Sequence, residues 1–314
     1  MNIFERMRNQ IRTYISAHET WLGRIWHGGL TWISLLVINS QFGYAKVLTN
    51  PIIAIVIALF CAFVPASAST FIIVLYLLVQ LMSLSYGVAF ATLLLFAISY
   101  AICSIYHSKR VDYLAGLPVC YQLHIPFILP LESALLGTIN EICAVICGGV
   151  LSYFLTAVHE NSAVILDTEA TLSASDLLLQ ELIANPMFYL YMISIILLFL
   201  VVYVLRCRDM DHAWLIAVVM GVLVEFVIML AASLFLGNVT GIPILIISNI
   251  VILLTGIIIT YIFRDLDYTR VEKVQFEDDD YYYYVTAIPK IKLTKEEEEI
   301  KTITKNFSEK GDDK

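Results

Sequence analysis

The sequence predicts an all-α polytopic membrane protein with about eight transmembrane helices, one re-entrant or interfacial half-helix, and a small cytoplasmic tail holding a β-hairpin and a short helix. Three observations predict this fold class. Of the 314 residues, 60% are hydrophobic and only 15% are charged, whereas an ordinary soluble domain is about 25% charged. The mean hydropathy is +0.82. Apolar runs close to the ~20 residues that cross the hydrocarbon layer recur along the chain.

Charge divides the chain into a membrane body and a tail. Residues 264–314 hold 10 of the 19 Lys and Arg residues and 14 of the 27 Asp and Glu residues. We therefore expect a transmembrane body at 26–263 and an acidic cytoplasmic tail at 264–314. The net charge of −8 argues against a nucleic-acid partner, because binding phosphates requires a basic surface.

Residues 1–25 are predicted to form an amphipathic helix that lies in the membrane interface, with its apolar side toward the lipid. The alternative is a soluble helix packed on the protein's own loops. Tryptophans follow at 21, 26 and 32, and this residue type prefers the headgroup level. Apolar residues recur at the helical period with arginines between them: Ile3, Phe4, Met7, Ile11, Tyr14 and Ile15, with Arg6, Arg8 and Arg12.

Eight apolar runs follow and are interpreted as spans. Pro51, Pro186 and Pro243 each stand near the start of a run, where the missing backbone N–H costs little and the fixed φ suits a helix. The predicted spans are residues 26–42, 45–64, 67–84, 86–105, 138–158, 187–206, 214–236 and 243–263.

Lys and Arg in the short loops predict the orientation of these spans. They occur before the first span, in loops 106–124 and 207–213, and after the last span, but not in 159–186 or 237–242. By the positive-inside rule, this pattern predicts a multi-pass protein of the cell membrane with both termini in the cytoplasm. Lys46, in the first outer loop, is the exception.

The stretch between these loops holds more apolar chain than one crossing requires. Residues 125–137 are too short to cross the bilayer, and they contain Pro126 and Pro130 and end at Gly137. Irregular backbone at membrane depth has to be surrounded by protein or a wet cavity. We interpret 125–137 as a re-entrant or interfacial half-helix. The alternative is one long, tilted, proline-kinked helix that continues into the next span.

Five polar residues in or beside the spans are candidates for a substrate or ion pathway: Glu132, Asn140, Glu141, Glu225 and Asn249. Glu225 lies in the middle of a span, where an ionised carboxylate costs about 2–3 kcal/mol, so it is protonated, paired or functional. Each candidate also has a structural interpretation. Glu141 shares a stripe with small residues that favour helix packing, and Asn249 can stabilise helix association through a hydrogen bond.

The tail contains two β-prone runs on either side of an acidic turn at 277–280, which suggests a small hairpin under the membrane body. Residues 294–304 read as a short capped helix. Because an isolated two-stranded hairpin is marginal in water, residues 268–305 are expected to need a partner surface, either the cytoplasmic loops or another protein.

No motif for nucleotide, metal or cofactor chemistry is present in the sequence. The histidines do not cluster at ligand spacing, and the six cysteines, with no C-x-x-C pair, are interpreted as small packing residues. We therefore expect no enzyme activity, no cofactor and no metal. An ATP-driven machine would require a separate ATPase subunit.

Three segments resemble a family of multi-span membrane proteins of Gram-positive bacteria, some of them labelled ABC-type permeases. They are the run from Asn50 to Pro65, the stretch H-I-P-F-I-L-P-L-E-S-A-L-L-G from His124, and D-D-D-Y-Y-Y-Y-V-T-A-I-P-K in the tail. The resemblance implies a multi-span membrane fold and assigns no functional residue.

Buried carboxylates beside a break in a helix are a pattern shared with many transporters. The sequence therefore favours a transporter or permease-type component for a small solute or ion. The alternative is a membrane-anchored scaffold whose tail recruits a partner, and an enzyme acting on lipid is a third, weaker hypothesis.

Overall fold

The computed structural model describes residues 14, 17–167, 183–208, 212–237, 241–263, 272–277 and 282–287. The chain divides into two units, Met1–Phe263 and Arg264–Lys314. In the described part of the first unit every regular element is a helix, and in that of the second it is a strand. The predicted N-terminal helix, apart from its last residues, and the predicted tail helix at 294–304 lie outside the described residues.

The first part of the helical unit consists of four helices, and prolines stand at the start of two of them. The Asn50 side chain accepts a hydrogen bond from the backbone N–H of Ile52 at 3.0 Å, with Pro51 in the first helical turn, which is a capping arrangement. Pro65 stands immediately before the next helix, without a side-chain capping bond. The four helices are α2 (Glu19–Phe42), α3 (Pro51–Cys61), α4 (Ala66–Met82) and α5 (Tyr86–Ile105).

The middle of the chain folds into short helices followed by a long one. His124 adopts a positive φ of 61° and reverses the chain, and the extended Gly137 and Thr138 then separate two further helices. The elements are α6 (Tyr113–Gln122), α7 (Ile128–Leu136), the 3-10 turn η1 (Ile139–Glu141), α8 (Ile142–Glu160) and α9 (Ser162–Asp167).

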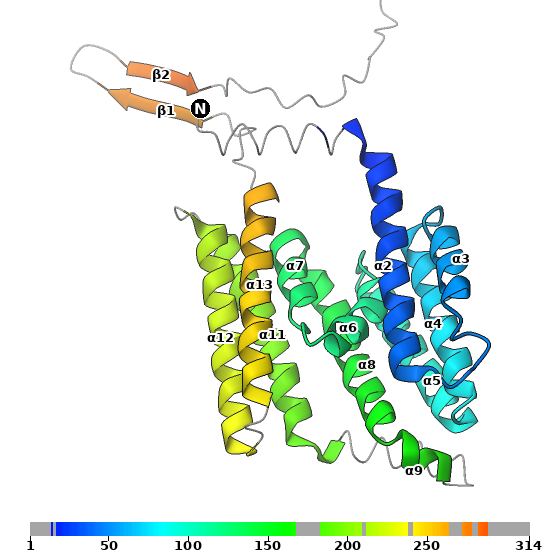
Figure 1. The fold of residues 1–314 in the computed structure, drawn as a ribbon. Coiled ribbons are helices and arrows are strands. Elements are labelled where there is room, and N and C mark those ends of the chain that lie inside the picture. Colours follow the sequence, from blue (N-terminus) through cyan, green and yellow to red (C-terminus); the bar gives the residue numbers. More distant parts are fainter. Residues whose placement is uncertain are drawn as a thin grey trace, which may run out of the picture. The chain divides into compact units, whose positions relative to one another are not determined.

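The last part of the helical unit consists of three long apolar helices, α11 (Pro186–Arg206), α12 (Ala213–Phe235) and α13 (Ile242–Phe263). Figure 1 shows these three helices on one side of the helical unit and α2 to α5 on the other, with α6, α7 and α8 between them. The short helices therefore occupy the centre of the unit.

Among the described residues, five helices are long and apolar enough to cross a membrane: Tyr86–Ile105, Ile139–Glu160, Pro186–Arg206, Ala213–Phe235 and Ile242–Phe263. These helices are those of a multi-pass membrane protein. Three of the eight predicted spans, 26–42, 45–64 and 67–84, are not among these five helices. Residues 45–64 yield only the 11-residue α3, which is roughly 16 Å long at 1.5 Å per residue, and residues 67–84 yield the 17-residue α4.

A buried polar network explains why the second predicted span is short. Gln80, fully buried on α4, accepts a hydrogen bond from the backbone N–H of Ala45 and donates to Asn39 on α2. The Tyr76 hydroxyl lies 2.7 Å from the Leu48 carbonyl oxygen. Side chains of α2 and α4 thus take up polar backbone groups of the 43–49 turn, which forms turns instead of continuing a helix.

The interpretation of 106–124 as a loop is wrong in part, because half of the segment is helical. The segment contains α6, whose Leu114, Leu117 and Val119 are buried in the core. Gly148 allows this packing, because a Cβ at Gly148 would lie only 2.7 Å from the Tyr113 carbonyl oxygen on α6. The alternative of one long kinked helix through 125–158 is also excluded, since α7 ends at Leu136 and Gly137 is extended.

The second unit contains two described strands, β1 (Glu272–Glu277) and β2 (Tyr282–Ala287). They pair antiparallel, with Glu272 opposite Ala287 and Glu277 opposite Tyr282. This two-stranded sheet falls on the β-prone runs of the tail. Its position relative to a membrane remains a prediction.

Candidate functional site

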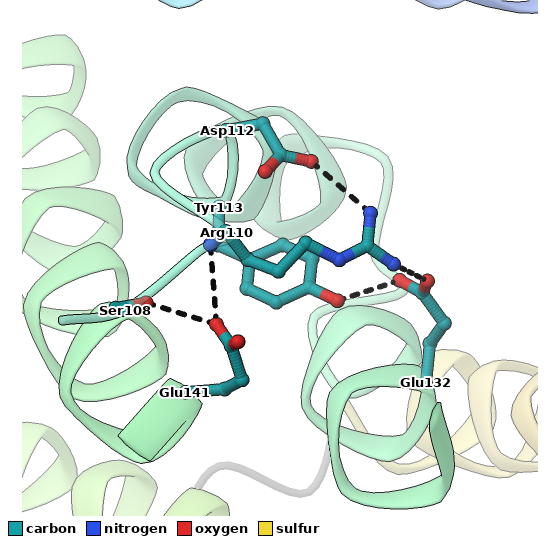
Figure 2. A network of polar contacts seen from close by, with 6 residues as sticks. All are labelled: Ser108, Arg110, Asp112, Tyr113, Glu132 and Glu141. Atoms are coloured by element: carbon teal, nitrogen blue, oxygen red, sulfur yellow. Dashed lines mark hydrogen bonds and ion pairs between the residues drawn. The ribbon is translucent and has the colours of Figure 1, made fainter. Parts of the chain in front are cut away.

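Arg110 and Glu132 join the beginning of α6 to α7. An Arg110 guanidinium nitrogen donates to Glu132 Oε1 at 2.6 Å, and the Tyr113 hydroxyl donates to Glu132 Oε2 at 3.0 Å. The guanidinium also lies 3.7 Å from the Asp112 carboxylate and 5.3 Å from the centre of the Tyr113 ring. Figure 2 shows Arg110 reaching between the two carboxylates, with the Tyr113 hydroxyl pointing at Glu132. The Glu132 carboxylate is therefore satisfied on both oxygens.

Glu141 belongs to the same cluster from the other side of the chain break. Its side chain is buried, at 2% exposure, and Oε2 accepts from the Ser108 hydroxyl at 2.9 Å and from the Arg110 backbone N–H at 3.2 Å. Glu141 thus holds the segment between α5 and α6 in place through these two hydrogen bonds, which Figure 2 shows as dashed lines. Helices α6 and α7 together form a helical hairpin. We call the cluster of polar residues that holds it the hairpin lock: Ser108, Arg110, Asp112, Tyr113, Glu132 and Glu141.

The electrostatics of the lock combine burial with pairing. Burial raises the pKa of Glu132 above its ordinary value, and the Arg110 guanidinium and the Tyr113 hydroxyl oppose that rise. Burial likewise raises the pKa of Asp112, with Arg110 opposing it. Burial would lower the pKa of Arg110, but Glu132 and the neighbouring acidic groups outweigh it and the pKa is raised. The positive charge of Arg110 therefore offsets the desolvation cost of the two carboxylates, Glu132 and Asp112.

Arg206, the last residue of α11, holds the C-terminal end of α7. Its guanidinium donates to the carbonyl oxygens of Leu135 and Gly137, the latter at 3.1 Å. These are carbonyls that a helix end leaves unpaired, and a cation there also complements the helix dipole. The guanidinium lies over the rings of Tyr203 and Trp214. Helix α7 is thus held by two arginines, Arg110 at Glu132 in its middle and Arg206 at its C-terminal end.

Glu225 lies elsewhere, in the middle of α12. It is 0% exposed, and neither carboxyl oxygen has a hydrogen-bond partner. Its polar neighbour is Asn249 on α13. Asn249 donates through Nδ2 to the Leu245 carbonyl oxygen at 3.0 Å, and its Oδ1 has no donor. An unpaired buried carboxyl group is costly, and positions of this kind call for an explanation.

Glycines bring the hairpin and the Glu225 region into close contact. A Cβ at Gly256 of α13 would lie 2.6 Å from Val218 of α12 and 2.9 Å from Leu131 of α7. A Cβ at Gly221 would overlap Val202 of α11. Small residues permit such close approach between helices in a membrane. Helix α7 therefore packs directly on the group of helices that holds Glu225.

A narrow apolar cleft with about 30 Å³ of free volume lies on the other face of the hairpin. It is lined by α6 and by parts of α2, α4, α5 and α8, and it does not include any of the five predicted pathway residues. Its polar lining groups are occupied: Thr92 donates to the Val88 carbonyl oxygen, and Gln122 donates to Thr156. The cleft thus offers an apolar surface next to the hairpin.

The structure brings the predicted pathway residues together in two groups. Glu132 and Glu141 meet in the hairpin lock, and Glu225 and Asn249 face each other between α12 and α13. Asn140 joins neither group, because its side chain is exposed. Asn140 therefore does not line a buried cavity.

Sequence analysis missed the two arginines that organise the hairpin. In the sequence, Arg110 lies in loop 106–124 and Arg206 is the last residue of the predicted span 187–206, where the positive-inside rule gives both only a role in orientation. A detectable signal was present, since Glu132 and Glu141 are acidic residues in an apolar stretch and need cationic or hydrogen-bonding partners. Comparisons with protein-family models, with curated proteins and with solved structures found no match to this chain.

Proposed function

We propose that this chain is a membrane transport component for a small solute or ion, in which Glu225 is the group that couples movement to an ion. The observation that carries the proposal is the complete burial of Glu225 without a hydrogen bond to either carboxyl oxygen. Ionisable residues inside a membrane protein mark ion pathways and proton relays more often than they serve packing.

The position of the hairpin supports a link between this carboxyl group and a solute. Helix α6 lines the apolar cleft, and α7 packs on Gly256 close to the Glu225 region. Broken helices at the binding site are a recurring feature of secondary transporters. The hairpin thus lines an apolar cleft on one side and packs on the other side against the helices that hold the ionisable group.

The transport proposal includes the predicted arrangement in the membrane. We place eight crossings in the cell membrane with both termini in the cytoplasm, and α6 and α7 as a re-entrant hairpin entered from that side. The Lys and Arg pattern of the loops supports this. The short α3 requires local thinning or protein cover. The proposal also includes the resemblance to permease-type proteins. If ATP drives the transport, a separate ATPase subunit has to supply the energy.

Flux in proteoliposomes tests the function. Purified protein is reconstituted without any ATPase, and uptake of candidate solutes is driven by a proton or sodium gradient. We expect Glu225→Gln to reduce gradient-driven uptake to the level of empty liposomes, because an amide retains the shape of the side chain but cannot exchange a proton.

The matched control is Glu160→Gln, which changes an exposed glutamate at the end of α8 and should leave uptake unchanged. Equal uptake by wild type and Glu225→Gln would contradict the proposed role of Glu225. Uptake that never exceeds the level of empty liposomes would count against transport.

A second candidate function is a membrane-anchored scaffold. It is favoured by the separate second unit, whose described strands pair only with each other, since a two-stranded sheet alone is marginal. Deletion of residues 268–305 is expected to abolish co-purification of a partner if the tail recruits one. Retention of the partner after this deletion excludes recruitment by the tail.

A further inference from the structure

Buried polar atoms without hydrogen-bond partners are concentrated in one part of the helical unit. Among the described side chains, all of them except Ser85 belong to α7, α11, α12 or α13. They are Ser133, Tyr191, Ser194, Glu225, Asn249 and Thr260. Native proteins pair almost every buried polar atom with protein or bound water. These atoms therefore gather on the four helices that surround Glu225.

The register of the helices places Glu225 and Asn249 at the centre of this group. Val218 of α12 meets Gly256 of α13, and the two helices run antiparallel. Glu225 lies seven residues after Val218 on α12, and Asn249 lies seven residues before Gly256 on α13. The two polar side chains are therefore level with each other between helices.

The Asn249 amide can serve both states of Glu225. Its Nδ2 donates one of its two N–H groups to the Leu245 carbonyl oxygen, and its Oδ1 has no donor. The second N–H can donate to an ionised Glu225, whereas a protonated Glu225 supplies the O–H that Oδ1 lacks. The amide thus suits a group that gains and loses a proton.

None of the described helices packed around Glu225 carries an unengaged charged residue that could offset the charge of an ionised carboxylate. On α11 the charged residue is Arg206, which is engaged by the carbonyls of α7. On α7 it is Glu132, which is paired with Arg110, and the described span α13 has none. The remaining titratable groups on these helices are tyrosines. A carboxylate in such surroundings takes up a proton rather than remain charged.

The helices also indicate that the bound ion is a proton and not Na⁺. Sodium sites in transporters use backbone carbonyls that are freed where a helix unwinds. Around Glu225 and Asn249, α12 and α13 are continuous helices, so their carbonyls are used in helix hydrogen bonds. What remains is one carboxyl group beside one side-chain amide, which suits a single proton.

We propose that Glu225 and Asn249 form a proton-binding site in which Glu225 takes up and releases a proton and Asn249 Oδ1 accepts the hydrogen bond of the protonated acid. This assignment rests on the proposed transport function for its role, but the site itself does not require transport. In one step a proton adds to the Glu225 carboxylate to give the neutral acid, and in the other the acid returns it.

Infrared difference spectroscopy on the full-length protein in liposomes tests the site without a transport assay. The wild type is expected to show the carbonyl band of a protonated carboxylic acid at neutral pH, and this band should disappear as the pH rises. Glu225→Gln should lack the band, and Glu160→Gln should retain it. Sodium added at constant pH should leave it unchanged.

A second variant keeps the test informative if Glu225→Gln does not fold. Asn249→Leu preserves the carboxyl group but removes its acceptor, so the band should shift to the higher frequency of an acid without a hydrogen bond. Identical bands in wild type and Glu225→Gln, a band removed by sodium, or an unshifted band in Asn249→Leu would each overturn the proposal. A normal band in a protein that shows no flux would refute transport and leave the site intact.

Discussion

Arg110→Ala is expected to lower the free energy of unfolding by about 1–3 kcal/mol at neutral pH. The change removes the cation that pairs with Glu132 at 2.6 Å and leaves that carboxylate, whose side chain is 20% exposed, without its main partner. Breaking a fully buried ion pair costs about 3–5 kcal/mol. The value expected here is lower because the Arg110 side chain is 40% exposed and solvent screens the interaction.

The loss caused by Arg110→Ala should also depend on pH. Burial raises the pKa of Glu132, and Arg110 opposes that rise, so in the variant the pKa of Glu132 moves further upward. A carboxyl group with a raised folded-state pKa contributes stability below its unfolded-state pKa, and that stability disappears as the pH rises through the folded-state pKa. The deficit of Arg110→Ala should therefore shrink as the pH is lowered toward the ordinary carboxyl range.

Reversible unfolding in mixed detergent micelles at several pH values measures both effects. Lys109→Ala, which removes an exposed neighbouring cation, should stay within about 0.5 kcal/mol of wild type. The double variant Arg110→Ala/Glu132→Gln should lose less than the two single variants summed, because it leaves no unpaired charge. A deficit that is the same at every pH would show that Arg110 does not act through Glu132.

Gly148→Val is expected to destabilise the protein by about 2–3 kcal/mol. A Cβ at this position would lie 2.7 Å from both the Tyr113 carbonyl oxygen and Leu117 Cδ1. The backbone oxygen cannot rotate away, so helix α6 has to shift relative to α8. That shift would also disturb the lock, since Tyr113 donates to Glu132.

Thermal unfolding, followed by the reactivity of the buried free cysteines Cys103 and Cys147, measures this loss. Gly29→Ala is the matched control, because a Cβ at Gly29 of α2 meets nothing within 4 Å. By helix propensity alone that change should stabilise the protein by up to about 1 kcal/mol. If Gly148→Val and Gly29→Ala have equal stability, the close packing of α6 on α8 is not required.

Much of the helical body could be predicted from local sequence signals. Long apolar runs produced the five helices that are able to span a membrane, and Pro51 and Pro186 correctly marked helix starts. The break at Gly137 was also predictable, because prolines, a glycine and two glutamates do not suit one lipid-facing helix. These features depend on residues that are neighbours in the chain.

Other features could not be predicted because they depend on residues distant in the chain. Helix α6 is short, contains Pro118 and directly follows the charged residues Arg110 and Asp112, so only burial against α8 reveals it as part of the core. Likewise, the 43–49 turn exists because side chains of two helices satisfy its backbone. Neither packing partner is visible in a window of local sequence.

The sequence by itself determined that this is a membrane protein, where its apolar helices run and which acidic residues are out of place in them. Only the tertiary structure decided that Glu132 is paired with Arg110 and that Glu225 is fully buried beside Asn249. The physical reason is that hydropathy is a sum over neighbouring residues, whereas the state of a buried carboxyl group depends on the few atoms that helix register brings to within hydrogen-bond distance.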